Sequence, residues 1–201
     1  TVLDQLARRH GLVGESVPSP LQSQRVFERS LVHALGDTRG ATSLAFNLQA
    51  LQGCAQALRE RLSPEHWQLI REVGEQFQDR LSAIFESAST DPITEVIGAL
   101  TRADGHLAAI TGGQTDRMTR DDGWRLLSVG RQLERLDFLS HAMACSFEHG
   151  LHRCDDGFAL MLGLFDSTIT YRAHFQARRE VPPLLHLLVF DTDNPRSLAW
   201  V

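Results

Sequence analysis

The sequence predicts an all-α protein, a single bundle of long helices. Apolar residues recur at three- and four-residue intervals through most of the chain, and the prolines lie between these periodic segments or at their starts. No segment offers a partner for an isolated strand. The composition agrees with this prediction, because 42% hydrophobic and 22% charged residues among 201 are typical of a globular protein with a full core.

The N-terminal residues predict two short helices with a loop between them. An apolar pattern from Thr1 to about His10 indicates a first helix, closed by Gly11. Glycine, serine and proline dominate the residues up to Leu21 and indicate an irregular connection. A second helix ending at Gly36 follows from the spacing of Val26, Phe27, Leu31 and Leu35.

Three longer helices are expected next. The first covers residues 44 to about 62, where leucine and alanine recur at helical spacing. Ser63-Pro64 begins the second, which runs to about residue 86, because serine caps helices and proline suits their first position. Asp91-Pro92 repeats this signal for the third helix, which is expected to end at Gly112-Gly113.

The segment from Asp121 to about Gly150 predicts a long helix around which the other observations are arranged. Its first turn is acidic and no proline interrupts it. One face is expected to be an ordinary core stripe, formed by Leu126, Val129, Leu133 and Leu136. A second face combines three charged residues, Arg131, Glu134 and Arg135, with the apolar Trp124, Leu127 and Phe138, which is an unusual mixture.

The C-terminal part predicts further helices. One is expected from Asp155-Asp156 to near Arg179, where Pro182-Pro183 break the pattern. Residues 184–190 fit a helix or a strand by pattern, and we favour a helix. Asn194-Pro195 has the form of a last helix start. Because the chain begins without methionine and stops soon after that start, we expect a fragment of a longer polypeptide.

Composition and charge exclude several classes of function. A net charge of -5 and a pI near 6.0 argue against nucleic-acid binding. All 20 basic residues are arginine, which excludes Schiff-base and Walker lysines, and we expect no cofactor. No apolar run approaches the roughly 20 residues that span a bilayer. Three widely spaced cysteines suit a reducing compartment, so we expect a cytoplasmic protein without membrane contact.

Metal and nucleophile sites are not indicated. Glu148, His149, His152 and Cys154 lie close together in the sequence, but the His-Glu-x-x-His and Glu-x-x-His spacings of helical metal sites are lacking. We therefore expect a solvated helix end and no metal. No Gly-x-Ser-x-Gly motif occurs, and Cys145 lies in an apolar helical context that favours a packed thiol.

Several short motifs follow one another along the chain. The central one is Gly123-Trp124-Arg125 followed by Gly130-Arg131-Gln132-Leu133-Glu134-Arg135. The others are Leu58-Arg59-Glu60-Arg61-Leu62-Ser63 with Trp67, Tyr171-Arg172, and Asp193-Asn194-Pro195-Arg196-Ser197-Leu198. Together they resemble the bacterial alpha-E domain family, which is named for predicted helices and a Glu-Arg motif. The resemblance spans Ser43 to the end, and we expect residues 1–36 to form an N-terminal segment and residues 37–201 a bundle truncated at its C-terminal end.

The resemblance implies partners rather than a reaction. Members of the family are typically fused to, or encoded beside, a circularly permuted ATP-grasp protein, often with a transglutaminase-like protein nearby. This neighbourhood implies peptide or amide-bond chemistry, although the role of the alpha-E domain itself is undefined. We therefore expect an ATP-grasp domain protein as partner, with a transglutaminase-like protein as a second one.

The candidate ligand-binding residues are Arg131, Glu134, Arg135, Arg196, Arg59 and Arg172. Arg131 is expected to pair with Glu134, leaving Arg135 free to bind carboxylate or phosphate; the alternative is a structural network. Arg196 would join helix-start amides in an anion pocket, or lie exposed. Arg59 and Arg172 either line a polar cavity or lie on a solvated face.

Three functions follow from these alternatives. The first is an accessory or interaction domain of an ATP-grasp-linked system that forms peptide or amide bonds, with the Arg/Glu face binding an anionic group or a partner. The second is an enzyme domain that acts on a peptide or amino-acid-like substrate. The third is a purely structural helical module.

Overall fold

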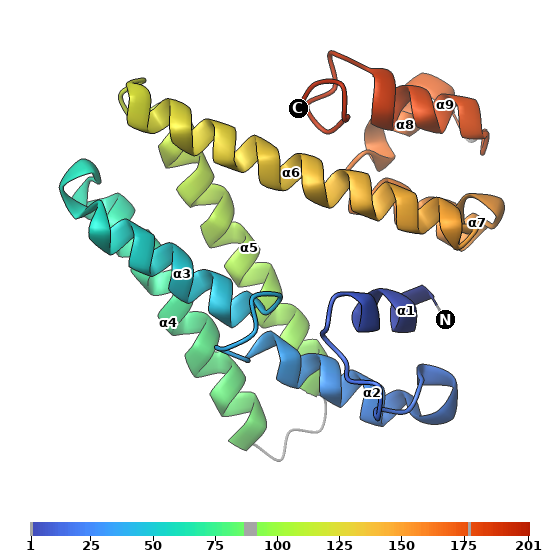
Figure 1. Cartoon of the computed structure of the whole chain (residues 1–201), viewed down its shortest axis with the longest axis horizontal. Coiled ribbons are helices and arrows are strands. Elements are labelled where there is room, and N and C mark those ends of the chain that lie inside the picture. The colour runs from blue at the N-terminus through green and yellow to red at the C-terminus, as the bar shows by residue number, and fades with distance from the viewer. Residues whose placement is uncertain (1, 87–91, 177) are drawn as a thin grey trace. The chain divides into compact units, whose positions relative to one another are not determined.

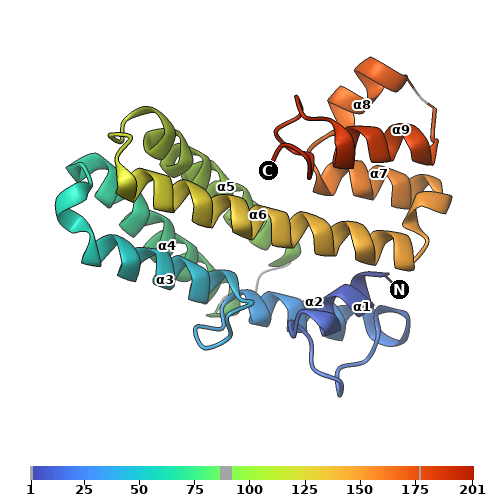
Figure 2. The ribbon, with the colours of Figure 1, turned by 45° about the horizontal axis from the view of Figure 1, so that its top comes forward.

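The computed structural model describes residues 2–86, 92–176 and 178–201, and every regular element in these ranges is helical (Figures 1 and 2). The predicted all-α fold is confirmed. The chain divides into two compact units, Thr1–Met118 and Thr119–Val201. Each unit has its own buried residues and is described by itself.

Unit 1 begins with two helices, α1 (Val2–Arg9) and α2 (Pro20–Leu35). After α1, Gly11 adopts a φ of +67°, which glycine reaches without steric cost. Helix α2 begins earlier than the serine and proline content suggested, because Ser19 and Gln22 form a capping box in which the Ser19 amide donates to Gln22 Oε1 at 3.0 Å. The expected irregular connection is correspondingly shorter.

The core of unit 1 is formed by three helices that lie side by side: α3 (Leu44–Ala57), α4 (Pro64–Glu86) and α5 (Pro92–Asp116) (Figures 1 and 2). A short 3-10 turn, η1 (Arg59–Arg61), follows α3. The predicted start of α4 at Ser63-Pro64 is confirmed, whereas Asp91 lies outside the described residues. The buried row of α4 is Ile70, Val73, Phe77, Leu81 and Ile84.

Helix α5 continues through Gly113 instead of ending there. A Cβ atom at Gly113 would lie 2.6 Å from His66 Nδ1, so glycine allows this part of α5 to approach α4. The glycine pair therefore marks a close helix contact rather than a helix end. His66 is buried by this contact, and its Nε2 atom lacks a hydrogen-bond partner in the described residues.

Unit 2 begins with α6 (Asp122–Glu148), as predicted. The Asp121 side chain caps it by accepting the Trp124 amide at 3.0 Å. The C-terminal half of α6 is anchored in the unit: it buries Leu139 and Met143 and contacts the 3-10 turn η2 (Leu151–Arg153) and α7 (Asp155–Leu164).

The apolar stripe on the N-terminal half of α6 is exposed, so the prediction that it forms core is wrong. The exposed fractions lie between 41% and 74% for Leu126, Val129, Leu133 and Leu136. The contacts of α6 with η2 and α7 lie beyond this row, because those elements follow the C-terminal end of the helix. Helical periodicity identified the apolar face correctly but not its environment.

A sharp turn interrupts the single helix expected from Asp155 to Arg179. Helix α7 ends at Leu164 and α8 (Thr168–Phe175) begins after Asp166, whose φ of 45° is left-handed. Ser167 is fully buried there and donates its hydroxyl to the Phe165 carbonyl at 2.8 Å. The favoured helix at residues 184–190 is confirmed by α9 (Val181–Leu185) and the π-helical turn η3 (His186–Phe190).

The expected helix start at Asn194-Pro195 is wrong, because residues 192–200 form turns. The buried Asn194 donates its side-chain amide to the Leu187 carbonyl at 2.9 Å, and its Oδ1 accepts the Arg196 amide at 3.1 Å. These bonds fold the segment back onto η3. The side chain of Asn194 thus holds a turn in place, where the pattern had suggested a helix cap.

Candidate functional site

A pocket of about 540 Å³ opens between α7, α8 and the residues after α8. This volume is within the range of small-molecule sites. Apolar side chains from Phe158, Leu162 and Tyr171 contribute to its lining, together with three arginines, Arg172, Arg178 and Arg179. Apolar walls with a few convergent cationic groups suit an organic anion.

Tyr171 fixes one wall of this pocket. The ring packs edge-on against Phe158, with 5.4 Å between ring centroids, and the hydroxyl donates to the Arg178 carbonyl at 2.7 Å. Burial raises the pKa of the Tyr171 hydroxyl, against a smaller lowering effect of its hydrogen bond to the Glu180 backbone. The phenol therefore stays protonated at neutral pH and holds the segment after α8 against α8 itself.

Two of the three arginines have no carboxylate partner within the described part of the chain. Arg179 forms an ion pair with Asp155, at the first turn of α7. Arg172, a predicted candidate, and Arg178 are both exposed and form no ion pair with a described residue. These two guanidinium groups are therefore available to an anionic ligand.

Arg196 has its hydrogen-bonding groups occupied by neighbours. Its guanidinium donates to Asp166 at 3.2 Å and to Thr170 at 3.0 Å, and its Nε to Asn194 Oδ1 at 3.3 Å. The amides of Ser197 and Leu198 donate to the carbonyls of Asn194 and Leu188. The anion pocket expected from a helix start is not formed by these groups, because no helix begins here and the amides are used internally.

The three charged residues on α6 lie at the surface. Arg131 and Glu134 are exposed, and the expected ion pair between them is not formed in the described structure. Arg135 donates from Nη1 to the Pro195 carbonyl at 3.1 Å, which ties α6 to the turn that contains Arg196. The structure thus brings Arg135 next to the Arg196 segment and leaves Arg131 and Glu134 in solvent.

Arg59 belongs to unit 1 and makes local contacts. Its Nη1 donates to the Leu62 carbonyl at 3.1 Å, and its guanidinium lies 5.6 Å from the centroid of the Trp67 ring. A cation above an indole face is a favourable stacking contact. This geometry holds η1 against the start of α4, and the ligand-binding role of Arg59 stays a prediction.

Cys145 and His149 do lie together, with 3.4 Å between Sγ and Nδ1. The same Nδ1 atom lies 2.7 Å from the Cys145 carbonyl oxygen, which can only accept a hydrogen bond. Nδ1 therefore carries the hydrogen that it donates to the carbonyl oxygen, and it cannot accept a hydrogen bond from the Cys145 thiol. Cys145 is buried, so the expected packed thiol is confirmed.

Within the described residues, no group of three or more His, Cys, Asp or Glu side chains could hold a metal ion. His152, part of the predicted cluster, instead stacks on Phe147 with 4.6 Å between centroids. None of the helices described is long and apolar enough to cross a membrane.

Arg178 and Arg179 line the pocket but were not among the residues predicted from the sequence. Adjacent arginines just after an aromatic helix end are a visible signal, but their contact with α7 depends on the chain reversal at Asp166. A left-handed aspartate is rare and has no dependable local pattern. The pocket could not be assembled without knowledge of that turn.

Comparison with known proteins places these features in a family. The chain matches Alpha-E, described as a predicted alpha-helical domain with a conserved ER motif, over residues 2–201. It is 24% identical over 160 residues to the uncharacterized proteins Rv2567 of Mycobacterium tuberculosis and Mb2597 of Mycobacterium bovis. The alignment covers 79% of this chain and 18% of each relative. No solved structure matches. Since the family match covers nearly all of the sequence, the chain belongs to the Alpha-E family.

Proposed function

We propose that the chain is an interaction domain of a cytoplasmic bacterial system that forms peptide or amide bonds, and that the exposed face of α6 binds its ATP-grasp protein. The observation that supports this proposal is the exposed row of Leu126, Val129 and Leu133, which lies on the face of α6 opposite to Arg131, Glu134 and Arg135. A transglutaminase-like protein would be a further member of the same system.

The exposed apolar row forgoes hydrophobic stabilisation, which a bound partner would restore by burying these side chains. Leaving large aliphatic side chains in water forgoes about 1.5–3 kcal/mol each relative to full burial. Contiguous apolar surface rimmed by polar groups is a common mark of protein-protein contact. The exposed charges of Arg131 and Glu134, on the other face of α6, steer association with a partner of complementary charge.

The length of the relatives and the composition of this chain bear on which protein of the system carries out the amide-forming reaction. The aligned region is 18% of the length of the mycobacterial relatives, so most of those proteins lies outside it. This chain contains no lysine, and neither Cys145 with His149 nor any described metal-ligand group offers the chemistry for amide formation. We assign that chemistry to the ATP-grasp protein and its positioning to this domain.

A second candidate function rests on the α7–α8 pocket. Its volume of about 540 Å³ and the free guanidinium groups of Arg172 and Arg178 favour an amino-acid or peptide-like ligand with a carboxylate. This would support the enzyme alternative. The purely structural alternative is supported by Arg135 and Arg196, which hold the C-terminal turn.

The proposal is tested by binding between the protein and an ATP-grasp protein encoded beside it. Leu133→Asp should weaken binding at least about tenfold, because a charge would be buried in an apolar contact. The matched control is Ile169→Asp, which changes an equally apolar side chain that is 84% exposed on α8. Unchanged affinity for Leu133→Asp, or equal loss for both variants, would contradict the proposal.

A further inference from the structure

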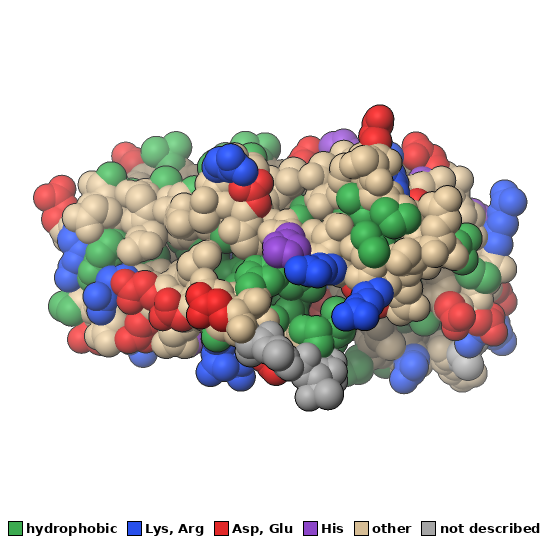
Figure 3. Space-filling model, turned by 90° about the horizontal axis from the view of Figure 1, so that it is seen from below, with side chains coloured by type: hydrophobic (Ala, Val, Ile, Leu, Met, Phe, Trp, Pro, Cys, Tyr) green, Lys and Arg blue, Asp and Glu red, His purple; other side chains and the backbone are tan. Residues whose placement is uncertain are grey.

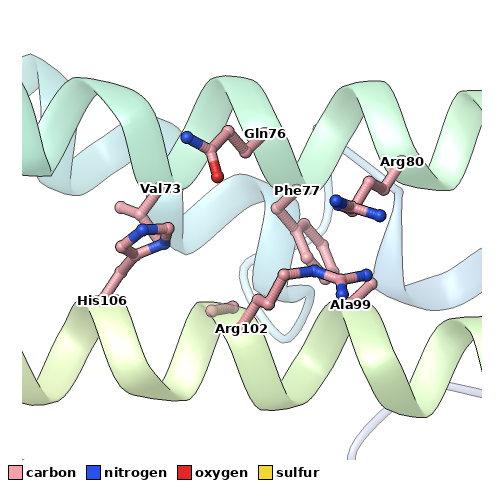
Figure 4. A pocket seen from close by; sticks show the side chains of 8 residues that line it. Val73, Gln76, Phe77, Arg80, Ala99, Arg102 and His106 are labelled. Atoms are coloured by element: carbon pink, nitrogen blue, oxygen red, sulfur yellow. The ribbon is translucent and has the colours of Figure 1, made fainter.

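Unit 1 contains a shallow basic groove between α4 and α5, which neither the sequence motifs nor the function proposed for α6 includes. Arginine and histidine side chains gather beside hydrophobic surface on the face shown in Figure 3. The groove is lined by polar groups of Gln76, Arg80, Arg102 and His106 over a floor of Val73, Phe77, Ala99 and Ala103 (Figure 4). We call these eight residues the α4–α5 groove.

The two arginines of the groove have no acidic partner along their own helices. Ion pairs on a helix form between residues three or four apart, and Arg71, for example, lies 3.9 Å from Glu75. Around Arg80 those positions hold Gln76, Phe77, Ala83 and Ile84. Around Arg102 they hold Gly98, Ala99, Gly105 and His106. Neither arginine forms an ion pair with any described residue.

The two guanidinium groups face each other across the groove. Arg102 lies back along α5, since a Cβ atom at Gly98 would be 3.6 Å from its Nη2 atom. Figure 4 shows the Arg80 and Arg102 side chains pointing toward one another from opposite helices, with Gln76 and His106 at the other end of the groove. Two like charges directed at one space are unfavourable unless an anion lies between them.

The enclosed part of the groove is too small for a phosphate, so a ligand group would lie at the open side, between the exposed side chains of Arg80 and Arg102. The volume of the enclosed part is about 10 Å³, which is roughly the space that one water molecule requires. Two permanent positive charges match a group that carries close to two negative charges. A phosphate monoester carries about -1.5 to -2 at pH 7 and three acceptor oxygens, whereas a carboxylate carries one charge and two oxygens.

We propose that the α4–α5 groove binds a phosphoryl group. Arg80 and Arg102 donate to its oxygens from opposite sides, as planar guanidinium groups do at phosphate sites. The apolar floor, which includes Phe77, limits the water that competes for these hydrogen bonds.

The proposal is tested by calorimetric titration of the whole chain with inorganic phosphate, phosphoserine and acetate at pH 7 and low salt. We expect saturable binding of the two phosphates, and a loss of about tenfold or more in Arg80→Gln and in Arg102→Gln, since hydrogen bonds to charged groups are the strong ones. Arg25→Gln is the matched control: Arg25 is an exposed arginine of α2, so the variant loses the same charge elsewhere in unit 1.

The possible outcomes separate the sources of the phosphoryl group. Tighter binding of phosphoserine than of inorganic phosphate would support the proposal and assign the group to a phosphorylated molecule, and equal binding would support it with free phosphate as ligand. Acetate binding as tight as phosphate, no binding by the wild type, or equal losses in Arg25→Gln and Arg80→Gln would overturn it. Helical circular dichroism of each variant verifies its fold, and Arg102→Lys, which keeps the charge, should retain part of the affinity.

Discussion

Helices α4 and α6 carry the same kind of apolar row in opposite environments. Along α4 the row is buried, and the exposed fraction of Leu81, for example, is 0%. Along the first half of α6 the corresponding row is exposed to solvent, and the exposed fraction of Leu126 is 74%. Both rows follow the helical repeat equally well. The difference lies in the neighbours, because α3 and α5 pack against α4 within unit 1.

The comparison separates two properties that a periodic sequence combines. Periodicity fixes which face of a helix is apolar, and packing fixes whether that face contributes to stability or remains available for binding. Stability of unit 1 should therefore depend on the row of α4, whereas the row of α6 should matter for association.

Truncating one leucine in each row should lower the free energy of unfolding by very different amounts. Leu81→Ala should lower the free energy of unfolding by about 2–5 kcal/mol, because it leaves a cavity in a closed core. Leu133→Ala should change it by less than about 0.5 kcal/mol, since 62% of the side chain is exposed. Urea denaturation of both variants measures the difference. Similar losses would show that the row of α6 is covered.

Glycines in the two regions should also respond in opposite directions. At Gly113 an added Cβ would meet His66 Nδ1 at 2.6 Å, so Gly113→Ala should destabilise the protein by about 1–3 kcal/mol. At Gly130 of α6 nothing lies within 4 Å, so Gly130→Ala should stabilise the helix by up to about 1 kcal/mol. Thermal unfolding distinguishes the two, and destabilisation by Gly130→Ala would reveal packing on α6.

The smallest effect concerns pH and the buried His66. Burial, with a smaller contribution from the charge of Arg117, lowers the pKa of His66 below its usual value of about 6.5. The unfolded chain then binds the proton more readily than the folded chain, so stability is full above about pH 6.5 and falls as the pH drops below it. His66→Gln should flatten this slope between pH 7.5 and 5.5.

An exposed histidine provides the control for that measurement. His10 lies at the surface beyond α1, so His10→Gln should leave the pH slope unchanged. Unfolding by urea at each pH gives the slope directly. An identical slope for the wild type and for His66→Gln would mean that the contact of His66 with α5 does not disfavour its charged form.

Local signals predicted most of the fold. The starts of α4 and α6 were visible as Ser63-Pro64 and as the acidic turn at Asp121, because caps act on their own helix. The reversal at Asp166 and the turn at Asn194 were not visible. They depend on bonds between distant residues, such as Arg196 with Asp166 and Asn194 with Leu187, which a local pattern does not contain.

The candidate sites were less predictable for the same reason. A sequence motif predicted Arg172 as a candidate residue. The pocket around it also requires Arg178 and Phe158, which lie near Arg172 only because the chain reverses at Asp166. The α4–α5 groove requires two helices to pair in register. Its sequence signal was the lack of acids three or four residues from Arg80 and Arg102, which becomes informative only when the two helices are known to face each other.

Hydroxyl-radical footprinting of the protein, alone and with the proposed ATP-grasp partner, measures directly whether the α6 row is open and whether a partner covers it. In the free protein Leu126 and Leu133 should be modified, while Phe77 and Leu81 should react little in either state. Addition of the partner should protect the α6 residues. Protection of Leu126 and Leu133 in the free protein, or equal modification with and without the partner, would contradict the account of α6 as an open interaction face.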